Sequence, residues 1–333
     1  LKPVYQNRQL KLHFREFRGC TIIDFFTLRP IVETLPLRAS RAIDYNAAMT
    51  VILADVLGYC MGVRRAVDSA LEALSKEARS GVFSLGPLIH NRAALNTLES
   101  KGLCVLGEAC AADAPRASTV IIRAHGVPPS VHETLRLRQC TVINATCPRV
   151  TSSQHLAAQY AERGAAVILA GDRNHGEVTG IAGYAGEKFF LVQNRAEALA
   201  FTSQTDAEGA ILLSQTTFNP AEFEAIAQIL QSKYQKLKVV NTICSATLER
   251  QEALLRLCPV VEGMLVVGGK NSANTKRLFQ TAQAHCAHAA LIEDASEIPD
   301  FFFSLKTVGI TAGASTPDSV IEDARQTLLC ASR

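Results

Sequence analysis

Two stretches in the middle of the chain repeat one pattern around a cysteine, and this repeat limits the folds that the chain can adopt. Val142–Cys147 and Val239–Cys244 each place Asn three residues before the Cys. In both copies Gln follows seven residues after the cysteine, Gly twenty-four after it and Asn twenty-seven after it. The region of Cys60 fits more loosely, with His90 and His125 following at 30 and 65 residues. Repetition of this pattern along the chain indicates three similar supersecondary units that pack together.

Apolar β-branched runs alternate with helical patterns from residue 49 onward, which is typical of parallel α/β sheets. The runs that predict strands are 51–54, 120–123, 142–144, 167–170, 211–214, 239–241, 265–267 and 308–311. The helical patterns cover 64–74, 152–161, 221–232, 248–257 and 318–329. We therefore expect an α/β fold of three similar units in a pseudo-threefold, or trefoil, arrangement. The expected units are residues 62–146, 147–243 and 244–330, with the strand in 49–61 joining the third.

Charge and hydropathy exclude several classes of protein. The 333 residues are 48% hydrophobic with a net charge of +3, and no uncharged apolar run approaches the roughly 18 residues of a membrane span. Residues 1–48 hold eight basic and four acidic residues, so the rest of the chain is near neutral and offers no broad basic face. We expect a cytoplasmic protein with no nucleic-acid or membrane partner. We also expect residues 1–48 to be an extension that is dispensable or not translated.

Cys60, Cys147 and Cys244 each follow a predicted strand at matched positions of the units. Residues beyond the carboxyl ends of parallel strands line a common crevice, so three units around one axis would aim these thiols at one point. Three thiolates without a fourth indicate an iron–sulfur cluster with one open iron, because structural zinc sites close with four ligands. The unmatched cysteines are expected to be small buried apolar residues, and these are Cys104, Cys110, Cys140, Cys258, Cys286 and Cys330.

A set of hydrogen-bonding residues stands at the other predicted strand ends. It contains His90, His125, His175, Thr216, Ser272, Asn274 and Ser315 and includes no Lys or Arg. Such donors beside helix N-termini suit a phosphate or diphosphate. Glu177 lies in a segment bounded by Gly176 and Gly180 that we interpret as a loop. It is either a solvated carboxylate or the proton source of a reductive reaction.

These motifs, in order, resemble the LytB-type family of iron–sulfur reductases. The resemblance covers about residues 49–329 and is carried by several short segments. They are Gly58–Val63, Ile89–Arg92, Ala124–Val127, Ala145–Pro148, His175–Val178, Gln215–Thr217, Ile243–Thr247, Lys270–Asn274 and Thr311–Ser315.

The resemblance implies an oxidoreductase that reductively dehydroxylates (E)-4-hydroxy-3-methylbut-2-enyl diphosphate. Its products would be isopentenyl and dimethylallyl diphosphate, at the last step of the non-mevalonate (MEP) isoprenoid pathway. It further implies one [4Fe–4S] cluster, a ferredoxin- or flavodoxin-type electron donor, and a proton-relaying Glu177. The implied cluster ligands are Cys60, Cys147 and Cys244. The implied substrate-binding positions are His90, His125, His175, Thr216, Ser272, Ala273, Asn274 and Ser315.

Four positions depart from the motifs usual in this family. Gly176 stands for Pro, Thr179 for a second Glu, Ala273 for Ser and Asn144 for Asp. Ala273 removes a hydroxyl and keeps its backbone N–H. We expect these changes to alter affinity more than activity. The chain has neither a G-x-G-x-x-G fingerprint nor a P-loop, which disfavours nicotinamide and ATP. A cluster-bearing hydro-lyase and a non-catalytic iron–sulfur or phosphometabolite sensor remain as alternatives.

Overall fold

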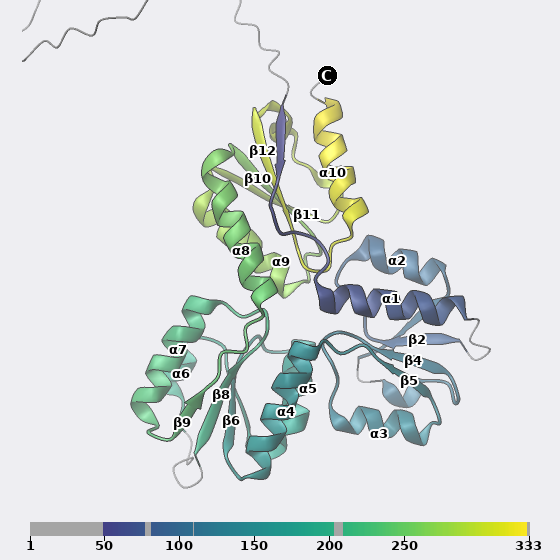
Figure 1. The fold of residues 1–333 in the computed structure, drawn as a ribbon, viewed down its shortest axis with the longest axis vertical. Helices are drawn as coiled ribbons and strands as arrows, with labels where there is room; N and C mark the ends of the chain where they lie inside the picture. Colours follow the sequence, from purple (N-terminus) through teal and green to yellow (C-terminus); the bar gives the residue numbers. More distant parts are fainter. Residues whose placement is uncertain (1–48, 77–80, 109, 203–208, 332–333) are drawn as a thin grey trace, which may run out of the picture. The chain divides into compact units, whose positions relative to one another are not determined.

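Three parallel sheets of four strands each make up the computed structural model (Figure 1), which describes residues 49–76, 81–108, 110–202 and 209–331. The first sheet contains Val82–Leu85 (β2), Leu103–Leu106 (β3), Thr119–Ile122 (β4) and Thr141–Asn144 (β5). The second contains Ala166–Ala170 (β6), Phe189–Val192 (β7), Ala210–Ser214 (β8) and Leu237–Val239 (β9). The third contains Thr50–Leu53 (β1), Gly263–Val267 (β10), His288–Ile292 (β11) and Thr307–Ala312 (β12). The expected extension, residues 1–48, lies outside the described residues.

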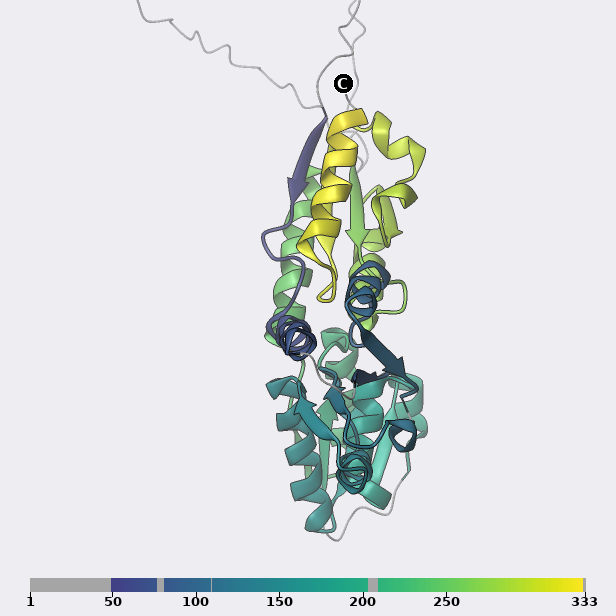
Figure 2. The same ribbon diagram turned by 90° about the vertical axis from the view of Figure 1, so that its right-hand side faces the viewer.

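Helices cover the sheets and complete three modules. The first module adds Met61–Ser75 (α1), Arg92–Ser100 (α2) and Pro129–Leu137 (α3). The second adds Pro148–Glu162 (α4), Gly176–Ala185 (α5), Arg195–Ala200 (α6) and Pro220–Lys233 (α7). The third adds Ser245–Leu257 (α8), Ala273–His285 (α9) and Asp318–Ala331 (α10), with α10 alongside β1 (Figures 1 and 2). Short 3₁₀ turns span 111–113, 186–188, 258–260, 295–297 and 300–304.

The three sheets share one strand order, which confirms the predicted α/β class with three similar units. The orders are β3-β2-β4-β5, β7-β6-β8-β9 and β11-β10-β12-β1. In the third sheet β1 takes the edge position that β5 and β9 hold in the others, pairing with β12 in parallel. After each of the strands β1, β5 and β9, the chain crosses to another module and begins a helix there. These three crossings are the points at which the modules meet.

Each sheet is buried on both faces, which explains why its central strands read as continuous apolar runs. In β6, Ala166, Ile168 and Ala170 pack into one core, and the alternate residues Val167 and Leu169 pack into another. The other two sheets also separate two apolar cores each. No helix in the described part of the chain is long and apolar enough to cross a membrane.

Every predicted strand and helix overlaps an observed one, although the strand predicted at 239–241 shares only Val239 with β9, and four strands and five helices were not predicted. The missed strands are β2, β3, β7 and β11, which are no shorter than several of the strands that were predicted. The missed helices are α2, α3, α5, α6 and α9. The expected loop from Gly176 to Gly180 was wrong, because it forms the first turns of α5. Three glycines made this helix difficult to predict from the sequence. One of them, Gly183, lets α5 pack closely, because a Cβ there would lie 2.4 Å from Pro128 Cβ.

Candidate active site

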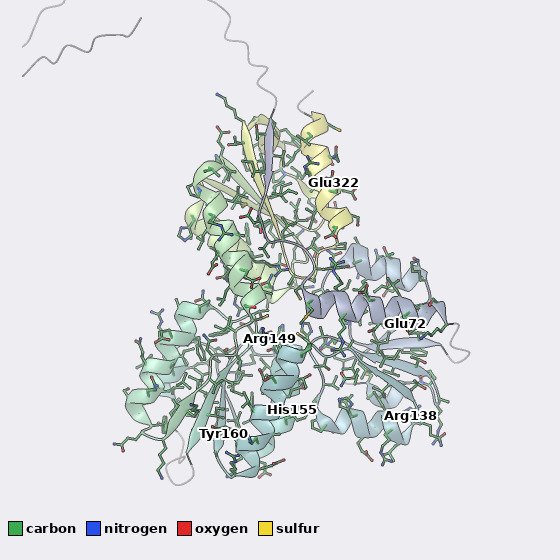
Figure 3. The ribbon with its side chains drawn as sticks, viewed as in Figure 1. Glu72, Arg138, Arg149, His155, Tyr160 and Glu322 are labelled. Atoms are coloured by element: carbon green, nitrogen blue, oxygen red, sulfur yellow. The ribbon has the colours of Figure 1, made fainter. Side chains whose placement is uncertain are left out.

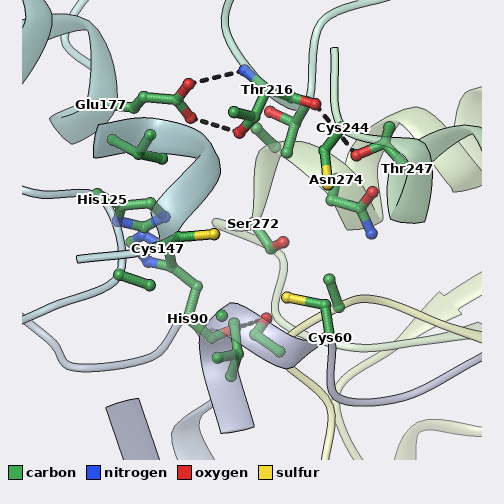
Figure 4. Close-up of a pocket in the computed structure, with 18 of the residues that line it drawn as sticks. Cys60, His90, His125, Cys147, Glu177, Thr216, Cys244, Thr247, Ser272 and Asn274 are labelled. Atoms are coloured by element: carbon green, nitrogen blue, oxygen red, sulfur yellow. Dashed lines mark hydrogen bonds between the residues drawn. The ribbon is translucent and has the colours of Figure 1, made fainter. Parts of the chain in front are cut away.

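All twelve residues singled out from the sequence line one cavity between the modules, and Figure 4 shows most of them. They are Cys60, His90, His125, Cys147, His175, Glu177, Thr216, Cys244, Ser272, Ala273, Asn274 and Ser315. Every module contributes to the wall, because each sheet directs the carboxyl ends of its strands toward this cavity.

The three matched cysteines occupy equivalent places in the fold. Cys60, Cys147 and Cys244 are the N-cap residues of α1, α4 and α8, and none of their side chains caps its own helix. Each thiol is therefore free to face the cavity at the positive end of a helix dipole (Figure 4). A Cβ on Gly62 would lie 2.8 Å from Cys147 Sγ, so the absence of a side chain there lets α1 approach the second cysteine.

Burial affects the pKa of one of these thiols more strongly than the helix N-terminus does. A helix N-terminus ordinarily lowers the pKa of a nearby thiol. For Cys147, however, burial raises the pKa, while the backbone N–H groups of Arg149 and Val150 oppose that shift. A metal centre binding here must therefore displace a thiol proton, as cysteine-ligated metals do.

The donor set of the cavity fits an iron–sulfur cluster. Three half-buried thiols from three helices face one space, and the described lining contains no fourth cysteine. No group of three or more His, Cys, Asp or Glu in the described ranges is close enough to hold a single metal ion. A cluster places each thiolate on a different iron, so these thiols do not need to converge on one ion.

The remaining cysteines follow the sequence expectation only in part. Cys258 is buried in the apolar core of the third module, as expected. Cys104 and Cys330 are exposed, so describing them as small buried apolar residues was wrong. Cys104 lies on the edge strand β3 and Cys330 in the last turn of α10, and the local sequence pattern does not show that these positions face solvent.

Three histidine rings form a row along one wall. The ring centroids of His90 and His125 are 5.1 Å apart and stacked, and those of His125 and His175 are 4.9 Å apart at an edge-to-face angle of 68°. Burial lowers the pKa of all three rings, to about 4 for His175. At neutral pH the row therefore offers neutral N–H donors to a ligand.

A helix cap sets the tautomer of His175. The Nδ1 atom of His175, the N-cap of α5, accepts the backbone N–H of Glu177 at 3.2 Å. Since Nδ1 is an acceptor, the ring proton sits on Nε2, at the opposite side of the ring. The sequence Asn-His-Gly thus produces both a helix start and an oriented donor.

Glu177 is a buried carboxyl group rather than a solvated one. It is 1% exposed, and burial raises its pKa to about 7. Its Oε1 accepts the backbone N–H of Thr216 at 2.7 Å, and its Oε2 lies 2.7 Å from Thr216 Oγ1 (Figure 4). These two hydrogen bonds favour the ionised form and hold the pKa below the value that burial alone would give. Glu177 can therefore carry a proton near neutral pH.

The cavity wall opposite the histidine row is polar and contains a donor without a partner among the described residues. Asn274 is 4% exposed, and its Nδ2 has no hydrogen-bond partner among the described residues. In the histidine row, Nδ1 of His125 has none in the same part of the chain. Ser272 caps α9 by accepting the N–H of Thr275, and Ser315 Oγ donates to the carbonyl of His90 at 3.4 Å. Buried polar groups are normally hydrogen-bonded, so a polar ligand or ordered water in the cavity would satisfy them.

Comparison with known proteins identifies the family. The pattern described as "LytB protein" matches residues 51–329. The chain belongs to the LytB family. The 4-hydroxy-3-methylbut-2-enyl diphosphate reductase of Treponema denticola is 50% identical over 288 residues, covering 84% of this chain and 99% of that protein. The protein of the same name from Aquifex aeolicus is 39% identical over 279 residues, covering 83% of this chain and 94% of that protein.

Solved structures of the same kind share the fold. The E-1-hydroxy-2-methyl-but-2-enyl-4-diphosphate reductase from Plasmodium falciparum superposes with a TM-score of 0.78 at 26% identity, covering 84% of this chain and 87% of that one. A structure described as (E)-4-hydroxy-3-methyl-but-2-enyl diphosphate reductase, the terminal enzyme of the non-mevalonate pathway, has a TM-score of 0.62 at 38% identity. It covers 84% of this chain and 99% of that one.

The positions that differ from the usual LytB motifs are accommodated locally. Asn144 Oδ1 accepts both the N–H and the hydroxyl of Thr146, at 3.0 and 2.6 Å, which an Asp carboxylate would also do. Thr179 is exposed and donates its hydroxyl to the carbonyl of His175 within α5. Gly176 lies against the guanidinium of Arg123, where a Cβ would be 2.2 Å from Nη2.

Four residues of this LytB site were not predicted. Thr247 lines the cavity and donates its hydroxyl to the carbonyl of Thr216 at 3.2 Å. It follows Cys244 by three residues, as Val150 follows Cys147, so the repeat itself carries a usable signal.

The other three are arginines that no motif pointed to. Arg149 lines the cavity near the meeting point of the modules (Figure 3), although the donor set singled out from the sequence includes no Lys or Arg. Arg250 is buried and donates to the carbonyls of Gly58 and Ala246, both at 2.7 Å, which ties the segments of two cysteines together. Arg123 is buried, and its charge acts on all three histidine rings.

Proposed function

We propose that this chain reductively dehydroxylates (E)-4-hydroxy-3-methylbut-2-enyl diphosphate to isopentenyl and dimethylallyl diphosphate. The observation that carries the proposal is the juxtaposition of three half-buried thiols, a row of neutral histidines and a buried carboxyl group in one cavity. The relatives named for this reaction match the chain over nearly their full length. The reaction consumes two electrons and two protons, breaks the allylic C–O bond and releases water.

The three thiols would hold a [4Fe–4S] cluster through Cys60, Cys147 and Cys244. When bound, the cluster would supply the two electrons and an open, Lewis-acidic iron for the substrate oxygen. Arg250 supports this assignment, because its buried positive charge lies beside Cys60 and Cys244 and offsets the negative charge of thiolates. A ferredoxin- or flavodoxin-type carrier would deliver the electrons.

The polar walls would hold the diphosphate group. His90, His125 and His175 offer neutral ring donors, and the unpartnered Nδ2 of Asn274 offers another. Ser272 and Ala273 stand at the N-terminus of α9, where backbone N–H groups and the helix dipole favour an anion. Ser315 completes this wall from the third module. Held there, the substrate would be oriented and shielded from water.

Glu177 would relay a proton through Thr216. Oε1 of Glu177 receives the Thr216 N–H, so the proton of the neutral acid sits on Oε2 and is donated to Thr216 Oγ1. The Thr216 hydroxyl can then turn its own proton toward the cavity that it lines. A pKa of about 7 keeps a supply of the neutral acid at physiological pH.

The test is an anaerobic assay of the cluster-loaded protein with the diphosphate substrate and a strong artificial reductant. We expect one molecule of water lost and two electrons consumed per molecule of product. Turnover without reductant would indicate a hydro-lyase, and binding without turnover would indicate a sensor. Either result would overturn the proposal. Iron and sulfide counts on the same sample report the loading independently of activity.

A further inference from the structure

The guanidinium of Arg123 lies against Gly176, the first residue of α5, next to the N-cap His175. Arg123 follows β4 directly and precedes His125 by two residues, and it is 3% exposed. Its Nη1 donates to Glu108 Oε1 at 2.5 Å, and its Nε is buried with no partner in the described part of the chain. The Glu108 side chain is 51% exposed, so the partner carboxylate is hydrated while the guanidinium is not. A buried cation with such incomplete compensation is costly to maintain.

Two glycines make room for this guanidinium. A Cβ on Gly86 would lie 2.9 Å from Arg123 Nη1, and a Cβ on Gly176 would lie 2.2 Å from Nη2. Gly176 is the first residue of α5, between the N-cap His175 and Glu177. The positive charge of Arg123 therefore lies against the first turn of α5, beside His175 and Glu177, which both line the cavity. A side chain at position 176 would displace it.

The histidines supply no positive charge to the cavity, and Arg149, which lines it, is exposed, so its charge is screened by solvent. Burial lowers the pKa of all three rings, so they are neutral donors at physiological pH. Among the described cations, Lys276 acts on His90 and Arg277 acts on His175, but Arg123 acts electrostatically on all three rings. Lys276 is exposed, and Arg277 is already paired with Asp172 at 2.8 Å.

We propose that Arg123 is a specificity-determining positioning residue, which places a buried positive charge near the histidine row to select a diphosphate, with Gly176 providing the space for it. The inference rests on the proposed function, because it concerns the anion held by the same cavity. Neutral donors bind neutral oxygens as well as anions, whereas a fixed charge discriminates in favour of the more highly charged group. The charge acts through space, with the histidines making the direct contacts.

Two substitutions that break the same ion pair distinguish this role from a structural one. Arg123→Gln removes the positive charge, and Glu108→Gln removes the negative charge and leaves the guanidinium in place. The probe is inorganic diphosphate, titrated calorimetrically into the cluster-loaded protein under anaerobic conditions. Arg136→Gln is the matched control, since Arg136 makes an exposed ion pair with Glu133 on α3, away from the cavity.

We expect Arg123→Gln to weaken diphosphate binding about tenfold or more, the scale of one unit charge at an effective dielectric constant of about 20. Arg123→Lys should bind within about threefold of the parent, and Glu108→Gln should bind as tightly or more tightly. In the catalytic assay, Arg123→Gln should raise KM with kcat changed less than about threefold. Equal weakening by Arg123→Gln and Glu108→Gln would show that only the ion pair matters, and would overturn the proposal.

Gly176→Ala tests the space that admits the charge. Alanine is a better helix former than glycine, so α5 should persist while its Cβ pushes the guanidinium away. We expect weaker diphosphate binding at unchanged iron content, and unchanged binding would refute the role of Gly176. Binding of inorganic diphosphate does not require turnover, so a failure of the proposed reaction and a failure of this inference give different results.

Discussion

Replacing Glu177 with Gln separates proton transfer from substrate binding. The amide preserves both contacts to Thr216: its oxygen accepts the backbone N–H, and its NH₂ group donates to Oγ1. The variant cannot donate a carboxyl proton, so kcat should fall by roughly 10²-fold or more, the usual scale for losing a general acid. Iron content should be unchanged, because the proposed cluster ligands are the three cysteines and do not include Glu177.

The same substitution has a predictable effect on stability. The pKa of Glu177 is raised from 4.5 to about 7 in the folded protein, so the folded state binds the proton more tightly than the unfolded state. Stability contributed by the neutral acid is therefore lost as pH rises from about 4.5 to about 7. From these pKa values, burying the carboxyl group costs about 3 kcal/mol at pH 8 and about 1 kcal/mol at pH 5.

The Gln variant does not titrate and should escape this cost. It should unfold at a higher temperature than the parent at pH 8, with the difference shrinking at pH 5. In parallel, the parental kcat should fall as pH rises above about 7, where the acid loses its proton. The residual rate of the variant should not share that decline. The measurements are anaerobic thermal unfolding and kcat at saturating substrate with an artificial reductant, across pH 5 to 9.

Two results would contradict the reasoning about Glu177. A variant that turns over at nearly the parental rate would refute the proton relay and leave the cluster assignment intact. A variant that is no more stable than the parent at pH 8 would show that the carboxyl group is not buried as an acid with a raised pKa. Thr216→Val is a useful companion, because it removes the hydroxyl of the relay and leaves Glu177 in place.

Three further predictions follow from the contacts around the cavity. Cys147→Ala should sharply reduce bound iron and abolish turnover, whereas Cys104→Ala, at an exposed cysteine, should do neither; equal iron content in both would refute the ligand assignment. Arg250→Gln should lower the reduction potential of the loaded protein in voltammetry, since a buried positive charge is lost, and an unchanged potential would refute its electrostatic role. Gly269→Ala should reduce stability and diphosphate binding together, because its Cβ would fall on the carbonyl oxygen of His90 and separate two modules; parental melting and binding would contradict this close approach.

The positions of the cysteines could be predicted from the sequence because they depend on local order along the chain. Each thiol follows an edge strand and begins a helix, and both the apolar strand and the helical period are visible in the residues themselves. The repeat around Cys147 and Cys244 then indicated equivalent units, and parallel sheets direct equivalent strand ends to one side. Even the loosely matched Cys60 lies in the same structural position.

The environment of the polar residues was decided only by the tertiary structure. Glu177 read as a loop carboxylate because glycines disfavour a helix locally, but α5 is stabilised by packing against α3 and α4. That packing buries the carboxyl group and raises its pKa. The role of Arg123 could not be predicted for a related reason, because its charge acts through space on histidines from three separate segments. Burial and electrostatic fields depend on distances between segments, which no local pattern in the sequence records.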